Sequence, residues 1–170
     1  GSDETQILQS LIDRELLPFQ TIDFKNGITR SETGELTLNQ KAGTFSAATP
    51  CSEALVLPEN ASGKGGFMEI RNRLSFGVFF AGSLDGTELQ KSKRIILMHL
   101  TDLKSQGAVF RDSSMNILEN AGEGKYLIRR GKAEITLNCP ETRKLFACAA
   151  DGERLFEVPF VRSGGTVTFT

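Results

Sequence analysis

Turn-forming pairs recur at close spacing through this chain, and that spacing limits the folds it can adopt. Short β-type segments are separated by Asn26-Gly27, Asp112-Ser113, Arg130-Gly131 and Asp151-Gly152. Asn-Gly and Asp-Gly between apolar segments are strong signals for tight β-hairpin turns. The strands do not alternate regularly with helices, as a parallel α/β sheet would require. The spacing predicts a mainly β chain, an antiparallel β-sandwich of jelly-roll or Ig-like type, with one short N-terminal α-helix.

One nearly uninterrupted apolar run, Arg94–Leu100 with the sequence RIILMHL, stands out among these segments. Seven residues are too few to cross a membrane as a helix. Turn residues flank the run on both sides, at Asp85-Gly86 and Ser105-Gln106-Gly107. A strand that is buried on both faces has this continuous apolar pattern. We therefore expect residues 94–100 to form the central strand of the sandwich.

Composition narrows the class of protein further. The 170 residues suit one domain, and a chain of this size buries about 70% of the surface that it exposes when unfolded. Twenty basic and 21 acidic side chains leave a net charge of 20 − 21 = −1, so neither nucleic acid nor membrane is an expected partner. The three cysteines cannot all pair with one another, and Cys148, in an apolar strand, is expected to be a small buried hydrophobe.

The N-terminal segment carries the one helical pattern. Ile7, Leu8, Leu11, Ile12 and Leu16 recur at helical spacing, which predicts a helix over Asp3–Leu17 that ends before Pro18. Asp3 is suited to cap this helix, with Gln6 three positions later. The apolar stripe has two possible uses: it packs on the sandwich, or it faces a neighbouring domain. We expect no signal peptide within these residues, and Gly1-Ser2 is typical of a cloning remnant, as found on a piece excised without its targeting segment.

Few residues belong to patterns that are typical of catalytic, phosphate-binding or metal sites. The single histidine, His99, lies inside the apolar run, where a satisfied core or edge histidine is the preferred interpretation over a catalytic one. Residues 63–66 resemble a phosphate loop only superficially and are predicted to belong to a mobile surface loop, 58–66. Neither a metal site nor a cofactor is expected. The carboxylates considered as a glycosidase pair are Asp85, Glu88, Asp102, Asp112, Asp151 and Glu153.

Carbohydrate binding is the remaining activity that needs to be weighed. Sugar rings dock on exposed flat aromatic faces, while polar groups bind the hydroxyls. The chain has no Trp and one Tyr, and its twelve Phe residues mostly lie in strand patterns that favour core packing. A glycan-binding site, if present, is predicted at Tyr126, Arg129 and Arg130. The alternative is that these three are ordinary strand residues.

Several blocks, in order, resemble the C-terminal β-sandwich region of large multidomain bacterial glycoside hydrolases and their relatives. Residues 31–36 (SETGEL) resemble the form S-D-T-G-E-L, with Glu32 in place of Asp, and residues 44–50 resemble the strand that follows it. Residues 83–86 (SLDG) and 92–102 resemble S-L-D-G and S-x-R-I-L-L-T-H-L-T-D, with Met98 where Thr is usual. Gly107, Leu127, Gly131 and the segment 144–159 continue the resemblance in the same order.

The resemblance implies a domain without catalytic residues of its own. In such enzymes the hydrolytic carboxylates lie on a separate catalytic domain, so residues 1–25 would be a helix and linker and residues 26–170 the sandwich domain. The implied function is a non-catalytic accessory domain of a secreted carbohydrate-active enzyme, with the catalytic domain of the parent chain as its partner and polysaccharide as a possible one. The alternative is a carbohydrate-binding module. The implied location is extracellular, periplasmic or on the cell surface.

Overall fold

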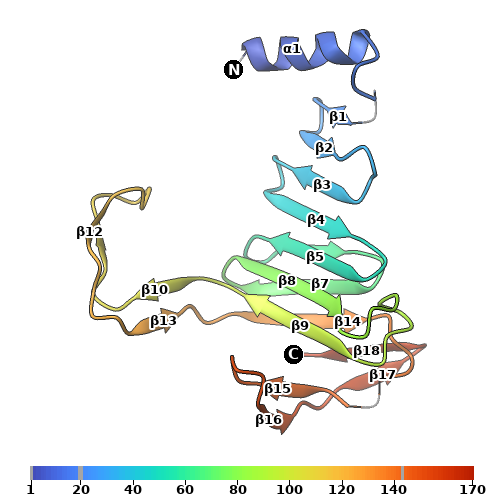
Figure 1. Ribbon diagram of the computed structural model, residues 1–170, viewed down its shortest axis with the longest axis vertical. Helices are drawn as coiled ribbons and strands as arrows, with labels where there is room; N and C mark the ends of the chain where they lie inside the picture. The colour runs from blue at the N-terminus through green and yellow to red at the C-terminus, as the bar shows by residue number, and fades with distance from the viewer. Residues whose placement is uncertain (1, 19–20, 143) are drawn as a thin grey trace.

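Antiparallel β-strands make up most of the chain, and a single helix precedes them (Figure 1). The computed structural model describes residues 2–18, 21–142 and 144–170. The predicted mainly β, sandwich-like class with one N-terminal helix is confirmed. The elements are α1 (Ser2–Asp13), β1 (Ile22–Asp23), β2 (Ile28–Arg30), β3 (Leu36–Asn39), β4 (Thr44–Ala48), β5 (Ser52–Leu57), β6 (Ser62–Lys64), β7 (Met68–Leu74), β8 (Gly77–Ser83), β9 (Ile95–Leu100), β10 (Leu103–Ser105), β11 (Val109–Phe110), β12 (Leu118–Asn120), β13 (Tyr126–Ile128), β14 (Lys132–Leu137), β15 (Phe146–Cys148), β16 (Arg154–Glu157), β17 (Val161–Ser163) and β18 (Thr166–Phe169).

The first half of the chain builds a seven-stranded sheet, the large sheet, with the order β1-β2-β3-β4-β5-β8-β9. Strands β1 to β5 follow one another as antiparallel neighbours, because tight turns join each strand to the next. Asn26-Gly27 lies in the first of these turns, and Gly27 adopts a φ of +67° there, which few residues other than glycine adopt readily. The β1–β2 hairpin thus has the turn chemistry that the sequence predicts.

A five-stranded sheet, the small sheet, has the order β17-β18-β14-β7-β6 and packs on one end of the large sheet. Strands β5 and β8 of the large sheet contact β6 and β7, and the core lies between them. The small sheet therefore covers only part of the large sheet, and β1 to β4 extend beyond it (Figure 1). The buried core consists of Leu55, Leu57, Phe67, Met68, Ile70, Phe79, Ala81, Leu89, Ala133, Leu137, Cys139 and Val167.

The apolar run at residues 94–100 does not form the central strand that the sequence predicts. It forms β9, which pairs with β8 on one side only and is an edge of the large sheet. Ile95 and Leu97 pack against the core, whereas Met98 and Leu100 are exposed. The run is apolar on both faces because alternate residues serve two different surfaces, and an apolar pattern does not by itself determine how many neighbours a strand has.

A buried carboxylate joins the two sheets near the glycine-rich segment. Glu53 on β5 is 4% exposed, and its Oε2 accepts the backbone N–H groups of Gly66 (2.7 Å) and Phe67 (3.0 Å). Its Oε1 accepts the N–H of Met68 at 2.7 Å. Residues 58–66 are therefore not simply the loose loop that was predicted, since they contain strand β6 and end in a backbone cradle. The amide groups do bind an anion, but it is a carboxylate of the same chain.

Helix α1 ends at Asp13, four residues before the predicted end at Leu17. Glu15 adopts a left-handed φ of +58°, and its N–H bonds the carbonyl of Ile12 at 2.9 Å. The N–H of Leu16 bonds the carbonyl of Leu11 at 2.9 Å, which completes a Schellman-type end. This end closes the helix before Pro18 can do so. The predicted cap rests on the side chain of Asp3, which lies outside the described residues.

Candidate functional site

A long two-stranded ribbon, residues 101–130, projects from the sandwich beyond β9 and is called the arm here (Figure 1). It consists of the antiparallel pairs β10–β13 and β11–β12. At its base the Thr101 hydroxyl donates to the carbonyl of Arg129 at 2.5 Å, and the Arg129 N–H donates to the carbonyl of Asp102 at 2.9 Å. These bonds hold the two strands of the arm together at its root.

Apolar side chains on the arm are largely exposed. Ile128 is 77% exposed, and no residue of β10 to β13 is fully buried. A two-stranded ribbon has little stability of its own in water unless an apolar layer packs on it. The exposed large apolar residues of the arm are Leu103, Val109, Met115, Ile117, Leu118, Tyr126, Leu127 and Ile128.

The three residues predicted to bind a glycan lie together near the root of the arm. Tyr126 on β13 is 69% exposed, so its ring is available to a ligand. Arg129 is engaged, since its guanidinium lies 3.1 Å from the carboxylate of Asp102. The backbone carbonyl of Arg130 accepts the hydroxyl of Ser75 at 3.2 Å, which ties this segment to the body. A sugar would therefore meet the exposed ring of Tyr126, while the guanidinium of Arg129 is already paired with Asp102.

Most of the carboxylates considered for glycoside hydrolysis have local partners. Glu88 pairs with Lys91 at 2.6 Å, and Asp102 pairs with Arg129. Asp112 accepts the N–H of Ser114, and Asp151 accepts the N–H of Glu153. Asp residues that bond the backbone two positions ahead stabilise turns. This bonding accounts for Asp112 and Asp151 without any catalytic use.

Asp85, in the SLDG segment, is the most extensively bonded of these carboxylates. Its Oδ1 accepts the Thr87 hydroxyl at 2.7 Å and lies within 2.9 Å of the hydroxyls of Ser83 and Ser92, and its Oδ2 accepts the N–H of Lys93 at 2.8 Å. The Thr87 hydroxyl, followed by the Lys93 N–H and the Ser83 hydroxyl, holds the pKa of Asp85 well below its usual range. Asp85 therefore stays ionised and organises the turn before β9.

His99 lies on the core-facing side of β9 and stacks on Phe79, with 4.3 Å between the ring centroids. Its Nε2 is buried and has no hydrogen-bond partner. Burial lowers the pKa of His99, so the ring is neutral at pH 7. The sequence-based interpretation as an edge or core histidine agrees with this position, although one ring nitrogen is unsatisfied. Gly77 and Gly131 leave space beside the ring that a Cβ atom would occupy.

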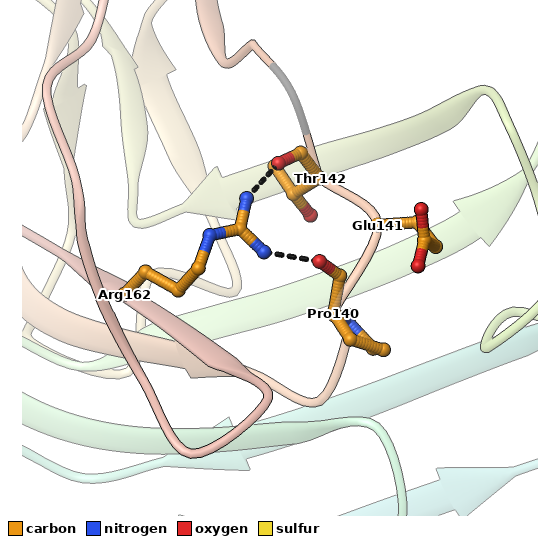
Figure 2. Close-up of a pocket in the computed structure, with 4 residues that line it drawn as sticks. All are labelled: Pro140, Glu141, Thr142 and Arg162. Atoms are coloured by element: carbon orange, nitrogen blue, oxygen red, sulfur yellow. Dashed lines mark hydrogen bonds between the residues drawn. The ribbon is translucent and has the colours of Figure 1, made fainter.

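A surface hollow of about 430 Å³ lies between the loop after β14 and strand β17 (Figure 2). It is lined by Pro140, Glu141, Thr142 and Arg162. The guanidinium of Arg162 donates to the carbonyls of Pro140 and Thr142, as Figure 2 shows. Arg162 therefore fastens the loop to β17 through these two contacts. None of the residues that line this hollow belongs to a recognisable motif, so the sequence gives no signal of it.

The three cysteines are free thiols in this structure. Cys139 is buried in the core, whereas Cys51 and Cys148 are exposed. The prediction that Cys148 is a buried hydrophobe is wrong, because β15 pairs only with β16 in a separate two-stranded sheet. Within residues 2–18, 21–142 and 144–170, no three His, Cys, Asp or Glu side chains gather as metal ligands would. No helix of the described chain has the length and apolarity needed to cross a bilayer.

Comparison with known proteins gave no match to a family, to a curated protein or to a solved structure.

Proposed function

We propose that this chain is a non-catalytic accessory β-sandwich module of a secreted carbohydrate-active enzyme, in which it braces the catalytic domain. The observation that carries the proposal is the arm, a ribbon that projects from the sandwich (Figure 1) and whose large apolar side chains are exposed. Exposed apolar side chains gathered on one projecting element mark an interaction site. A neighbouring domain seated against the arm supplies the apolar layer that the ribbon lacks.

The bonding of the acidic residues supports a non-catalytic role. A retaining or inverting glycosidase needs two carboxyl groups facing one substrate bond, one of them able to donate a proton. Asp85 is fixed by hydroxyl and amide donors, and Glu88 and Asp102 are held in ion pairs. The SLDG block, which carries much of the resemblance to glycoside hydrolases, is a turn in this chain. Its role here is to shape the fold rather than to cleave a substrate.

The first experiment tests for hydrolysis. The purified chain is incubated with a panel of nitrophenyl glycosides and with soluble polysaccharides, and released nitrophenol and reducing ends are measured. We expect no turnover above the buffer rate. Turnover that disappears on replacing any one of the six carboxylates would refute the proposal.

The second experiment tests the bracing role of the arm. The catalytic domain encoded in the same reading frame is titrated with the chain by calorimetry. The double variant Leu103→Ser/Ile128→Ser is expected to lose at least about tenfold in affinity, because both side chains are exposed and contribute to the docked surface. Leu155→Ser on β16 is the matched control, since Leu155 is as exposed but lies outside the arm. Equal affinity for all three proteins would refute a bracing role.

Direct glycan binding is the second candidate, and the exposed ring of Tyr126 favours it. Electrophoresis through gels that contain soluble polysaccharide measures this binding as a loss of mobility. A binding module is retarded by its glycan, Tyr126→Ala abolishes the retardation, and Tyr126→Phe preserves most of it because stacking needs only the ring. Unretarded migration in every polysaccharide excludes this candidate.

A further inference from the structure

The face of the large sheet that points away from the core is apolar across five strands, and we call it the outer face. The register aligns Leu38, Phe45, Val56, Val78 and Leu100 in one row across β3, β4, β5, β8 and β9. The neighbouring row consists of Leu36, Ala47, Ala54, Phe80 and Met98. None of these ten side chains is charged, and none is fully buried. Leu100 is 54% exposed.

The large sheet is not apolar on both faces, because β3 and β4 carry polar side chains on the face opposite to the outer face. Thr37 and Asn39 on β3, with Ser46 and Thr44 opposite them on β4, lie on the side that faces toward the small sheet. The small sheet does not reach these two strands, so their polar side chains are on the face where an apolar core would otherwise lie. An antiparallel sheet with one solvated face normally carries its polar residues on that face. The outer face therefore has the composition of a surface that is covered.

Helix α1 carries a second apolar surface, the helix stripe, made up of Ile7, Leu8, Leu11 and Ile12, none of which is fully buried. Ile7 is 59% exposed, and α1 contacts no strand of the described chain. The helix lies beyond β1, at the end of the large sheet that is farthest from β9 (Figure 1). The sequence raised two alternatives for the stripe, packing on the sandwich or facing a neighbouring domain. In the described chain α1 does not pack on a strand of the sandwich, and the neighbouring domain stays a prediction.

The chain that follows α1 leaves the helix at a hydrogen-bonded end. The Schellman-type end at Glu15 and Leu16 fixes the direction in which the chain leaves the helix. The N–H of Thr21, immediately before β1, bonds the carbonyl of Pro18 at 3.0 Å. The described residues on this path therefore give α1 a defined C-terminal end.

We propose that two copies of this chain form a symmetric dimer in which the helix stripe of each copy packs on the outer face of the other. The length of α1 agrees with the width of the outer face. A 12-residue helix is about 18 Å long, and five strands span about 19 Å from the axis of the first strand to that of the last. Both surfaces lack charge, and one copy supplies both halves of the contact. Each copy contributes ten residues of the outer face and four of the helix stripe, 10 + 4 = 14, toward the small end of stable interfaces, so we expect a micromolar dissociation constant.

Sedimentation equilibrium of the full chain between about 1 and 300 µM tests the dimer. The wild-type chain is expected to pass from monomer to dimer in this range. Leu38→Glu, and separately Leu8→Glu/Leu11→Glu, are expected to weaken the dimer at least about tenfold, because each places a charge in an apolar contact. A wild-type chain that stays monomeric throughout overturns the proposal.

Each variant has a matched control on the same element. Thr37→Glu adds the same charge to the other face of β3, and Gln6→Glu adds it to the opposite side of α1, so both should dimerise as the wild type does. A dimer that all four variants leave unchanged overturns the proposal, because it must use another surface. Far-UV circular dichroism identifies any variant that fails to fold.

A mixing experiment decides which chain supplies the helix, even if a glutamate variant does not fold. Leu11→Cys and Leu38→Cys are made in separate chains in which Cys51 and Cys148 are replaced by serine. Under mild oxidation, the mixed chains should form a disulfide-linked heterodimer, whereas each chain alone should form far less. If the mixture does not cross-link, the proposal is wrong. If one chain that carries both cysteines closes as a monomer, the helix packs on its own sheet and the proposal is again wrong.

The dimer is independent of the proposed accessory function. Sedimentation and cross-linking use no glycan and no catalytic domain, so a negative result in the hydrolysis, titration or gel experiments leaves this test unaffected. Conversely, a monomeric chain can still brace a catalytic domain through the arm.

Discussion

The contact between Gly65 and Glu53 allows a sharp test of what joins the two sheets. A Cβ atom on residue 65 would lie 2.3 Å from the Glu53 Cδ and 2.4 and 2.5 Å from its two oxygens. The carboxylate of Gly65→Ala must therefore move away from the N–H groups of Gly66, Phe67 and Met68 that it now accepts. Hydrogen bonds to a charged group contribute about 1.5–3 kcal/mol each, so losing two of the three costs roughly 3–6 kcal/mol.

This loss is measurable against the stability expected of the whole chain. At about 0.05–0.15 kcal/mol per residue, 170 residues give a free energy of unfolding of roughly 8–25 kcal/mol. Urea unfolding followed by far-UV circular dichroism is the suitable assay, because the chain has no Trp and a single Tyr. The midpoint for Gly65→Ala should fall well below that of the wild type while the slope stays unchanged.

The neighbouring glycine provides the control. A Cβ on Gly66 would meet only the Glu53 Oε2, at an ordinary 3.7 Å, so Gly66→Ala should change stability by less than about 1 kcal/mol. In a Glu53→Ala background the clash is absent, and Gly65→Ala should then cost almost nothing. The reasoning is refuted if Gly65→Ala is no more destabilising than Gly66→Ala, or if its cost persists without the carboxylate.

Three further outcomes follow from individual side chains. Burial lowers the pKa of His99, so this side chain binds a proton more readily in the unfolded chain than in the folded one. Stability should therefore fall as the pH drops through about 6.5. Urea midpoints measured between pH 8 and pH 5 should show this pH dependence in the wild type and its loss in His99→Phe. Asp85 has a depressed pKa, so its stabilising effect is present above about pH 4 and is lost as the pH falls further. Asp85→Asn should lower the melting temperature at pH 7 and reduce the difference in melting temperature between pH 7 and pH 3. Two thiols, Cys51 and Cys148, should react rapidly with Ellman's reagent in the native state, and Cys139 only on unfolding; rapid reaction of all three would contradict the buried position of Cys139.

Local sequence signals predicted the hairpins well. Asn26-Gly27 and Asp151-Gly152 both lie in tight connections between antiparallel strands, because glycine at positive φ is a property of the turn itself and needs no distant partner. The same holds for Asp85, whose bonding partners are all within ten residues of it. Where a structural role depends on close neighbours in the chain, the residue types alone identify it.

Predictions that depended on distant residues were less successful. Residues 63–66 have the composition of a mobile loop, yet they fold around Glu53, which is ten or more positions earlier in the chain. Cys148 has apolar neighbours but lies on a small separate hairpin, so it is exposed. The predicted glycan residues lie together near the root of the arm, and the engagement of Arg129 by Asp102 follows from the pairing of β10 with β13.

The sequence by itself determined the strand-and-turn character of this protein, because alternation of side chains and turn chemistry act over a few residues. Only the tertiary structure decided which surfaces stay uncovered. The run at residues 94–100 could equally have been a central strand or an edge, and the stripe of α1 could have been buried or presented. Those outcomes depend on which sheet reaches which strand, and in this chain the small sheet stops short of β3 and β4.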